Sequence, residues 1–202
     1  MLESPKLSIC LATYNRGLFI GETLDSILGQ LPPTVELVVV DGASPDNTPE
    51  VMGKYLQKYP QIRYYREQEN SGIDKDYDKA VGYAKGEFCW LMTDDDLLHP
   101  NAVVRVLLAL DDEIDLVVVN AEVKSADFSK SLDTALIKLS TDKKFDAQNN
   151  EEFFQKTVQA LSFIGCVVIR RNLWLSRNRS LYYGTLFIHC LLYTSDAADD
   201  MQ

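Results

Sequence analysis

The chain has 202 residues and a formal net charge of −10, with 30 acidic and 20 basic side chains. Its 46% hydrophobic and 25% charged residues are ordinary for a folded domain and exclude wholesale disorder. The acidity argues against a nucleic-acid partner, because a phosphate backbone needs clustered Lys and Arg. The length suits one α/β domain.

Segments with strand and helix patterns alternate through the first 121 residues. In chain order they are a strand at 6–13, a helix at 18–28, a strand at 35–40, a helix around 51–56, a strand at 62–66, a helix at 74–85, a strand at 87–93, a helix at 99–110 and a strand at 114–121. This alternation predicts βαβ units and a mainly parallel sheet flanked by helices.

The pattern weakens beyond residue 121. Residues 124–149 are polar and have no strong period, which predicts either a long loop over a site or a poorly ordered insertion. Apolar spacing predicts a further helix at 151–161 and a strand at 163–169.

The four cysteines Cys10, Cys89, Cys166 and Cys190 lie far apart, without the spacing of a zinc site. We expect buried, reduced thiols in a cytoplasmic protein. The first residues lack a signal-peptide pattern. No apolar stretch reaches the ~20 residues that cross a bilayer, so peripheral association with the inner face of a membrane is the membrane role left open.

Three aspartates, Asp94, Asp95 and Asp96, directly follow the strand predicted at 87–93. Adjacent carboxylates at the end of a buried strand repel one another, so we expect a cation to bind there. The alternative is a solvated turn of acids that caps the following helix. Ligands of parallel sheets bind beyond the carboxyl ends of the strands, where the segment 13–15 and Asp41 should meet the three aspartates.

Four segments resemble the nucleotide-sugar glycosyltransferases of family 2, which have the GT-A fold: LSICLATYNRG at 7–17, VELVVVDGASPDNT at 35–48, ENSGID at 69–74 and AKGEFCWLMTDDDLLHP at 84–100. They occur in the family's order and at its usual spacing. Residues 72–96 further resemble the abequosyltransferase-type subgroup, which transfers deoxysugars in surface-polysaccharide assembly. The resemblance implies an α/β, GT-A (Rossmann-like) fold and a nucleotide-diphosphate sugar as donor.

The resemblance also implies a Mg²⁺ or Mn²⁺ ion, which hard oxygen ligands suit. It makes Asp95 the direct metal ligand and Asp94 a contact to the ribose or the metal. Asp96 is then a second ligand or a group behind the ligands. His189 either approaches the metal or diphosphate or is a buried structural histidine, which is the favoured reading.

By the same resemblance, Thr13, Tyr14, Asn15 and Arg16 line the nucleotide pocket. Tyr14 could stack on the base. Arg16 either offsets phosphate charge or is a solvent-exposed cation.

Asp41 either accepts the ring N–H of a pyrimidine or is a turn residue, and a turn or cap role fits Asp46 better. The family's common second aspartate is Gly42 here, so one polar contact to the nucleotide is expected to be missing.

The segment with Asn70, Gly72 and Asp74 is expected to form the next loop of the nucleotide pocket. Gly72 supplies a backbone conformation that other residues avoid. Asp74 either reaches the nucleotide or caps the following helix.

Inverting members of the family need a carboxylate base for the acceptor hydroxyl. Glu151 and Glu152, at a predicted helix start, are weak candidates, and Asp127, Asp133 and Asp146 are loop candidates. None has a motif around it, so the base stays unassigned.

We expect a single domain over residues 1–193, with a nucleotide-sugar-binding half at 1–121 and a partial acceptor-side half at 122–193. Residues 194–202 are expected to be a non-native or disordered tail, which would make the chain a truncated product. The expected activity is metal-dependent transfer of a sugar to a saccharide or lipid-linked saccharide, in cell-surface polysaccharide or glycolipid synthesis. The alternatives are a non-catalytic nucleotide- or sugar-binding module and a nucleotidyltransferase, although the segment ATYNRG supplies little of the basic, glycine-rich loop of the latter.

Overall fold

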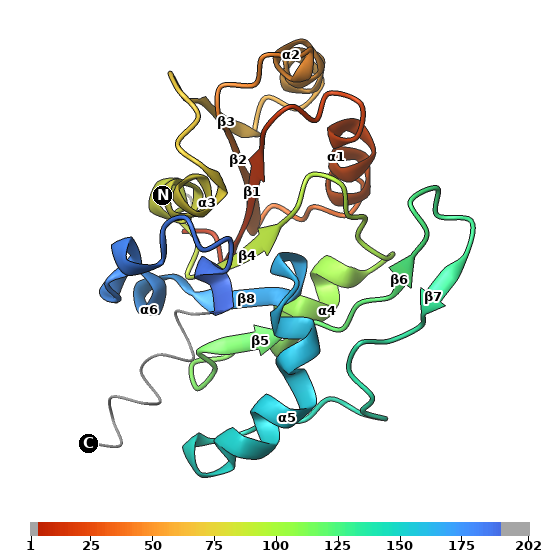
Figure 1. The fold of residues 1–202 in the computed structure, drawn as a ribbon, viewed down its shortest axis with the longest axis vertical. Coiled ribbons are helices and arrows are strands. Elements are labelled where there is room, and N and C mark those ends of the chain that lie inside the picture. The colour runs from red at the N-terminus through yellow and green to blue at the C-terminus, as the bar shows by residue number, and fades with distance from the viewer. Residues whose placement is uncertain (1–3, 191–202) are drawn as a thin grey trace.

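A six-stranded sheet with helices on both faces forms the body of the protein in the computed structural model, which describes residues 4–190 (Figure 1). The strands are β1 (Leu7–Thr13), β2 (Val35–Asp41), β3 (Arg63–Arg66), β4 (Phe88–Met92), β5 (Leu116–Val118), β6 (Val123–Lys124), β7 (Ser131–Asp133) and β8 (Val167–Arg170). The helices are α1 (Ile20–Leu28), α2 (Thr48–Lys58), α3 (Ile73–Tyr83), α4 (Ala102–Ala109), α5 (Asn150–Leu161) and α6 (Arg171–Ser176), with short 3₁₀ turns η1 (Ala147–Asn149), η2 (Ile164–Cys166) and η3 (Arg179–Tyr182).

The sheet has the strand order β3-β2-β1-β4-β8-β5, and its first four strands are parallel. β1 lies between β2 and β4, with Thr13 opposite Asp41 and Leu11 opposite Met92. Parallel strands in register end at the same edge, so the segments that follow β1, β2 and β4 emerge side by side. The predicted α/β fold with a mainly parallel sheet is confirmed.

The far side of the sheet differs from the expectation. The strand predicted at 163–169 begins only at Val167, after the turn η2, and it runs antiparallel between β4 and β5. β5 is also shorter than the predicted 114–121. β8 therefore places the later part of the chain in the same sheet as the earlier part.

Alternation along β1 divides the core into two layers. Leu7, Ile9 and Leu11 face one side, where they pack with α1, α2 and α4, and Cys10 and Ala12 face the other side with α3 and α6. Every residue of β1 is buried, as expected for a central parallel strand covered on both faces.

The polar segment 124–149 is more ordered than a plain loop. It contains β7, which pairs with β6 in a small hairpin, and the turn η1. Leu136 and Ile137 from this segment are buried against Ala160 and Cys166, so part of it packs onto α5 and η2. The expected tail at 194–202 lies outside the described residues.

Cys10, Cys89 and Cys166 are buried, free thiols, as predicted, whereas Cys190 is only half-buried. Within residues 4–190, every helix is too short or too polar to cross a lipid bilayer.

Candidate active site

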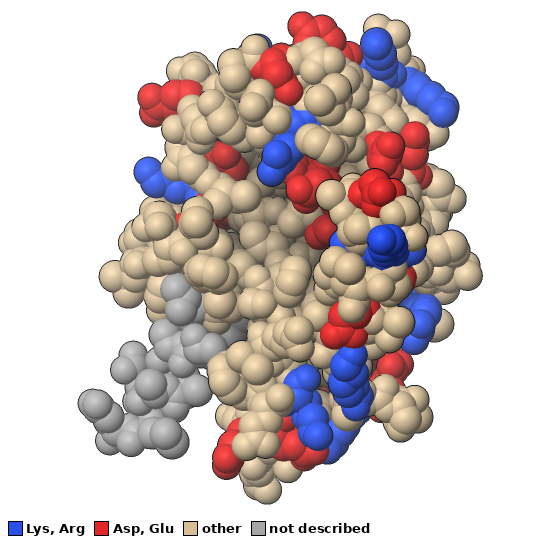
Figure 2. Space-filling view, turned by 45° about the vertical axis from the view of Figure 1, so that its right-hand side comes forward, with Lys and Arg blue, Asp and Glu red and all other residues tan. Residues whose placement is uncertain are grey.

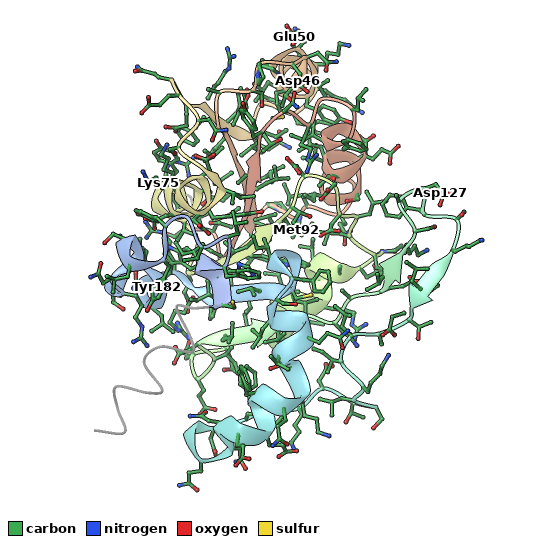
Figure 3. The ribbon with its side chains drawn as sticks, in the orientation of Figure 1. Asp46, Glu50, Lys75, Met92, Asp127 and Tyr182 are labelled. Atoms are coloured by element: carbon green, nitrogen blue, oxygen red, sulfur yellow. The ribbon has the colours of Figure 1, made fainter. Side chains whose placement is uncertain are left out.

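The strand register brings two of the predicted site residues level with each other. Leu11 of β1 is opposite Met92 of β4, so Thr13 and Asp94 lie two residues further along their own chains at the same edge of the sheet. Figure 3 marks Met92 near the middle of the molecule, where β4 gives way to the loop that carries the aspartates. Asp41 ends β2 on the other side of Thr13.

Asp94 is the most enclosed of the three aspartates, with 8% of its surface exposed. Arg16 Nε donates a hydrogen bond to its Oδ1 at 3.3 Å. Burial raises the pKa of Asp94, as does the adjacent Asp95, and Arg16 partly offsets this. The Thr13 hydroxyl is close enough to lower that pKa, yet Oγ1 makes no hydrogen bond of normal geometry among residues 4–190. A buried carboxylate and a buried, unpartnered hydroxyl therefore share the end of β1.

The other two aspartates point to different surroundings. Asp95 is exposed, and its Oδ2 lies 3.9 Å from Arg16 Nη2. Asp96 Oδ2 accepts a hydrogen bond from Thr93 Oγ1 at 2.5 Å, and desolvation, followed by Asp95, raises the pKa of Asp96. In the part of the chain that the structure describes, no group of three His, Cys, Asp or Glu residues could hold a metal ion by itself.

The loop after β1 is fixed by the loop after β2. The backbone N–H of Asn15 donates to Ser44 Oγ at 3.0 Å, and that of Gly17 donates to Asp46 Oδ2 at 2.9 Å. Asp46 Oδ1 also accepts a hydrogen bond from the backbone N–H of Thr48, the first residue of α2, which is the turn role that sequence favoured. Asn15 has a φ of 58°, a left-handed conformation that Asn tolerates better than most residues.

These contacts hold Tyr14 and Arg16 at the surface of the strand edge. Tyr14 is 44% exposed, so its ring has an open face. A pocket of about 500 Å³ opens beside Arg16 and is lined by Asn15, Arg16, Leu18, Phe19, Asp46 and Asn47. Figure 2 shows a hollow in the middle of one face, with acidic and basic side chains along its upper edge.

Asp41 is completely buried and already has partners for both carboxylate oxygens. The backbone N–H of Ser44 donates to Oδ1 at 2.7 Å, and Tyr64 Oη donates to Oδ2 at 2.6 Å. Burial and the Asp41 carboxylate together raise the pKa of Tyr64. These contacts favour the turn role of Asp41, which anchors the loop that in turn holds residues 15–17.

The loop between β3 and α3 contains the next two predicted site residues. Asn70 Oδ1 accepts a hydrogen bond from the backbone N–H of Gly72 at 2.9 Å. Gly72 has a φ of 90°, which side chains strongly disfavour, and α3 begins directly after it. Asn70 Oδ1 would lie 3.7 Å from a Cβ atom added to Gly42, so Asn70 comes near the end of β2.

Asp74 is used differently from its expected nucleotide role. It is 3% exposed, and its carboxylate accepts backbone hydrogen bonds from Gly184, Leu186 and Ile188 at 2.8, 2.9 and 3.3 Å. Asp74 therefore fixes the segment 184–188 against the start of α3. Neither sequence alternative for Asp74, a nucleotide contact or a cap of the following helix, included this long-range anchor.

His189 follows this anchored segment and is 1% exposed. Desolvation lowers its pKa, and neither ring nitrogen has a hydrogen-bond partner of normal geometry among residues 4–190. Its ring centroid lies 6.2 Å from that of Phe187. Its surroundings are those of a buried histidine that is neutral near pH 7.

Glu151 and Glu152 are not brought to the strand edge. They occupy the first turn of α5, which lies at the bottom of Figure 1, at the end of the helix remote from β4. Glu152 forms an ion pair with Lys143, and Glu151 accepts a hydrogen bond from Gln155 at 3.2 Å. The loop candidates Asp127, Asp133 and Asp146 are each engaged in local turn contacts.

Two residues that support the site were not found from sequence. Tyr77 of α3 is fully buried and donates a hydrogen bond from Oη to the Met92 carbonyl at 2.8 Å, which fixes the end of β4. Asp76, one residue earlier, lies against Gly42 at the end of β2. A polar residue inside an amphipathic helix pattern was the available signal for Asp76.

A mainly parallel sheet with helices on both faces defines an α/β protein, and proteins of this class bind their ligands beyond the carboxyl ends of the strands, where Asp94 and Arg16 lie. Residues 8–177 match the model of glycosyl transferase family 2, and the chain belongs to this family. The resemblance seen in the sequence is thereby confirmed.

Abequosyltransferase RfbV of Salmonella typhimurium is 25% identical over 200 residues, covering 94% of this chain and 60% of that protein. S. aureus TarS 1-349 in complex with UDP has a TM-score of 0.64 at 22% identity, over 93% of this chain and 53% of that one. Mannosyltransferase PcManGT of Pyrobaculum calidifontis, in complex with GDP-Man and Mn²⁺, has a TM-score of 0.58 at 21% identity, over 86% of this chain and 46% of that one. The chain thus spans 60% of RfbV and about half of each of these solved chains, which share its GT-A fold.

Proposed function

We propose that this chain is a metal-dependent glycosyltransferase domain that moves a sugar from a nucleotide-diphosphate sugar to a saccharide or lipid-linked saccharide. The observation that carries the proposal is the group formed by Asp94, Arg16 and Thr13 at the ends of β1 and β4. It joins a buried carboxylate, a guanidinium at 3.3 Å and a buried hydroxyl without a partner among residues 4–190. Such a group suits a ligand that carries both hydroxyls and charge.

The residues present fit a Mg²⁺ or Mn²⁺ ion shared with a diphosphate. Mg²⁺ in such sites is commonly held by one or two carboxylates plus substrate phosphates rather than by a cage of protein ligands. Asp95 is exposed at this edge, and Asp94 lies beside it, so these two would hold the ion. Asp96, occupied by Thr93, would act from behind them. The bound ion would stabilise the negative charge that grows on the diphosphate as the glycosidic bond breaks.

Three further residues would bind the nucleotide or hold the binding loops in place. Arg16 would pair with the diphosphate, since guanidinium groups bind phosphate oxygens with two parallel hydrogen bonds. Tyr14, with its open ring face, would stack on the base or ribose. Asp41 would fix the loop after β2 that holds Asn15 in place.

The relatives support the donor class. RfbV is described as an abequosyltransferase, and the two solved structures hold UDP or GDP-Man, the latter with Mn²⁺. Together with the residues 72–96 that resemble abequosyltransferases, they support a role in cell-surface polysaccharide or glycolipid synthesis. We assign donor binding to residues 1–121 and part of the acceptor side to 122–193.

Donor hydrolysis in the presence of Mn²⁺ tests this function. UDP-, GDP-, CDP- and dTDP-sugars are compared for the wild type, Asp95→Ala and the remote control Asp112→Ala. We expect one donor class to be hydrolysed, with a loss of at least about 100-fold in Asp95→Ala and none in the control. Metal-dependent nucleotide binding without turnover would instead favour a binding module. Absence of metal-dependent binding would rule out both.

A further inference from the structure

One buried carboxylate beside the strand ends has no assigned role in ligand binding so far. Asp76, in the first turn of α3, is 3% exposed. Its Oδ1 accepts a hydrogen bond from Ser71 Oγ at 3.0 Å and lies 3.6 Å from Lys79 Nζ. Its Oδ2 accepts no hydrogen bond from residues 4–190 and is not completely shielded from solvent.

Asp76 Oδ2 is aimed at the backbone at the end of β2. A Cβ atom added to Gly42 would lie 2.5 Å from this oxygen, closer than any normal contact, and 3.7 Å from Asn70 Oδ1. Glycine at position 42 therefore leaves room for a carboxylate that comes from α3. Gly42 donates its backbone N–H to the Thr13 carbonyl, so Asp76 lies over the junction of β1 and β2.

Asp41, the neighbouring carboxylate on β2, cannot serve this junction equally well. Both of its oxygens already accept hydrogen bonds, from Ser44 and Tyr64, and it is completely buried. Asp76 Oδ2 is not sealed from solvent and accepts no hydrogen bond from residues 4–190, so it is available to a donor on a bound ligand. The free acceptor at this junction is on α3, not on the strand.

We propose that Asp76 accepts a hydrogen bond from an N–H group on the base of the bound nucleotide-diphosphate sugar. This inference rests on the proposed function and adds a base-recognition residue to it. Asn70 complements Asp76, because its Oδ1 is taken by the Gly72 N–H and its amide NH₂ is left to donate. Adjacent donors and acceptors of this kind lie on the pairing edges of nucleobases. Asp76 thus supplies from a helix the carboxylate that Gly42 does not supply from the strand.

Binding titrations separate base recognition from a structural role. Wild type, Asp76→Asn and the remote control Asp112→Asn are titrated with Mn²⁺ and UDP, CDP, GDP or dTDP, and with Mn²⁺ and pyrophosphate, which has no base. Asn keeps the size of Asp but replaces the free acceptor by a donor. We expect the best-bound nucleotide to bind about 10- to 100-fold more weakly to Asp76→Asn, with pyrophosphate unaffected and the control equal to wild type.

The outcomes distinguish this inference from the proposed function. If Asp76→Asn binds all four nucleotides as tightly as the wild type, the inference is wrong and the donor site stands. The inference also fails if the nucleotides bind no better than pyrophosphate to the wild type. If the wild type binds neither nucleotide nor pyrophosphate, both proposals fail.

Moving the carboxylate from α3 to the end of β2 gives a second, independent test. In Asp76→Ser the carboxylate is lost, and in the double variant Gly42→Asp/Asp76→Ser it returns on β2, where the space has been freed. We expect the double variant to recover most of the nucleotide affinity lost in Asp76→Ser. A folded double variant that binds as weakly as Asp76→Ser would overturn the claim that Asp76 reaches the base across Gly42.

Discussion

Arg16 and Asp94, 78 positions apart in the sequence, form an ion pair in which Nε lies 3.3 Å from Oδ1. The pair joins the loop after β1 to the loop after β4 across the carboxyl ends of two neighbouring strands. Arg16 is 45% exposed in its side chain and Asp94 is 11% exposed, so the guanidinium can turn toward a ligand while the carboxylate stays fixed. In the function proposed above, this one cation would pair with Asp94 in the free protein and with the diphosphate in the complex.

Replacing Arg16 by Met should weaken binding of UDP with Mn²⁺ about tenfold, because a charge-assisted contact to the diphosphate is lost. Arg16→Lys should retain part of the affinity, since Lys keeps the charge without the paired hydrogen bonds. Titration of UDP with Mn²⁺ at low and high salt checks this. The difference in affinity between Arg16→Met and the wild type should shrink at high salt. Equal affinity of Arg16→Met and wild type at low salt would refute it.

Asp94→Asn should stabilise the ligand-free protein at neutral pH. Burial raises the pKa of Asp94, so the folded state holds this proton more tightly than the unfolded state does. The carboxyl therefore contributes stability at low pH that is lost as the pH rises from the ordinary Asp pKa of about 4 through the raised folded value. The Tm of Asp94→Asn should exceed that of wild type by a few degrees at pH 7.

Thermal unfolding between pH 3.5 and 8 measures that difference, which should vanish at the acid end. The same variant should bind UDP with Mn²⁺ more weakly, so its stability and its affinity change in opposite directions. A Tm gain that stays constant across the pH range would show that the Asp94 charge is not its cause.

Asp74→Ala should destabilise the fold by about 2–3 kcal/mol, because three backbone N–H groups of the segment 184–188 lose a charged acceptor. Urea unfolding measures the loss, and amide hydrogen exchange should rise in residues 184–188. The exposed Asp112→Ala is the matched control. Unchanged stability together with lost nucleotide binding would instead support a direct nucleotide role for Asp74.

Tyr77→Phe should cost about 1–3 kcal/mol, since the buried Met92 carbonyl loses its side-chain donor. Tyr83→Phe, on the same helix but 37% exposed, should cost much less. Because Met92 ends β4, the Tyr77 variant should also lose some affinity for UDP with Mn²⁺. The prediction is contradicted if the two variants unfold at the same urea concentration.

The sequence predicted the parallel half of the fold well. Runs such as residues 35–40 are apolar without alternation, which is the pattern of a strand buried on both faces, and β2 matches this run. The antiparallel insertion of β8 was out of reach, because periodicity identifies a strand but not its neighbours or direction. The hairpin of β6 and β7 was missed because strands this short and polar have no hydrophobic pattern to identify them.

The candidate site was predicted in outline. Strand ends could be located from apolar runs, and Thr13, Asp41 and Asp94 do meet at one edge of the sheet. The sequence could not show that Asp74 anchors the segment 184–188 while Asp76 lies against Gly42. Residues two apart on a helix point in nearly opposite directions, so only one of the two can face the strand ends, and the helix rotation that decides this comes from packing.

The position of β8 has a consequence for how this protein is made. β4 has β1 on one side, but its other neighbour, β8, is synthesised much later in the chain. At ribosomal rates the interval is on the order of ten seconds. Throughout it, the edge of an entirely apolar strand, FCWLM, is open to pairing with other nascent chains. Expression yield should therefore depend on chaperones and on translation speed between β4 and β8 more than on the stability of the finished sheet.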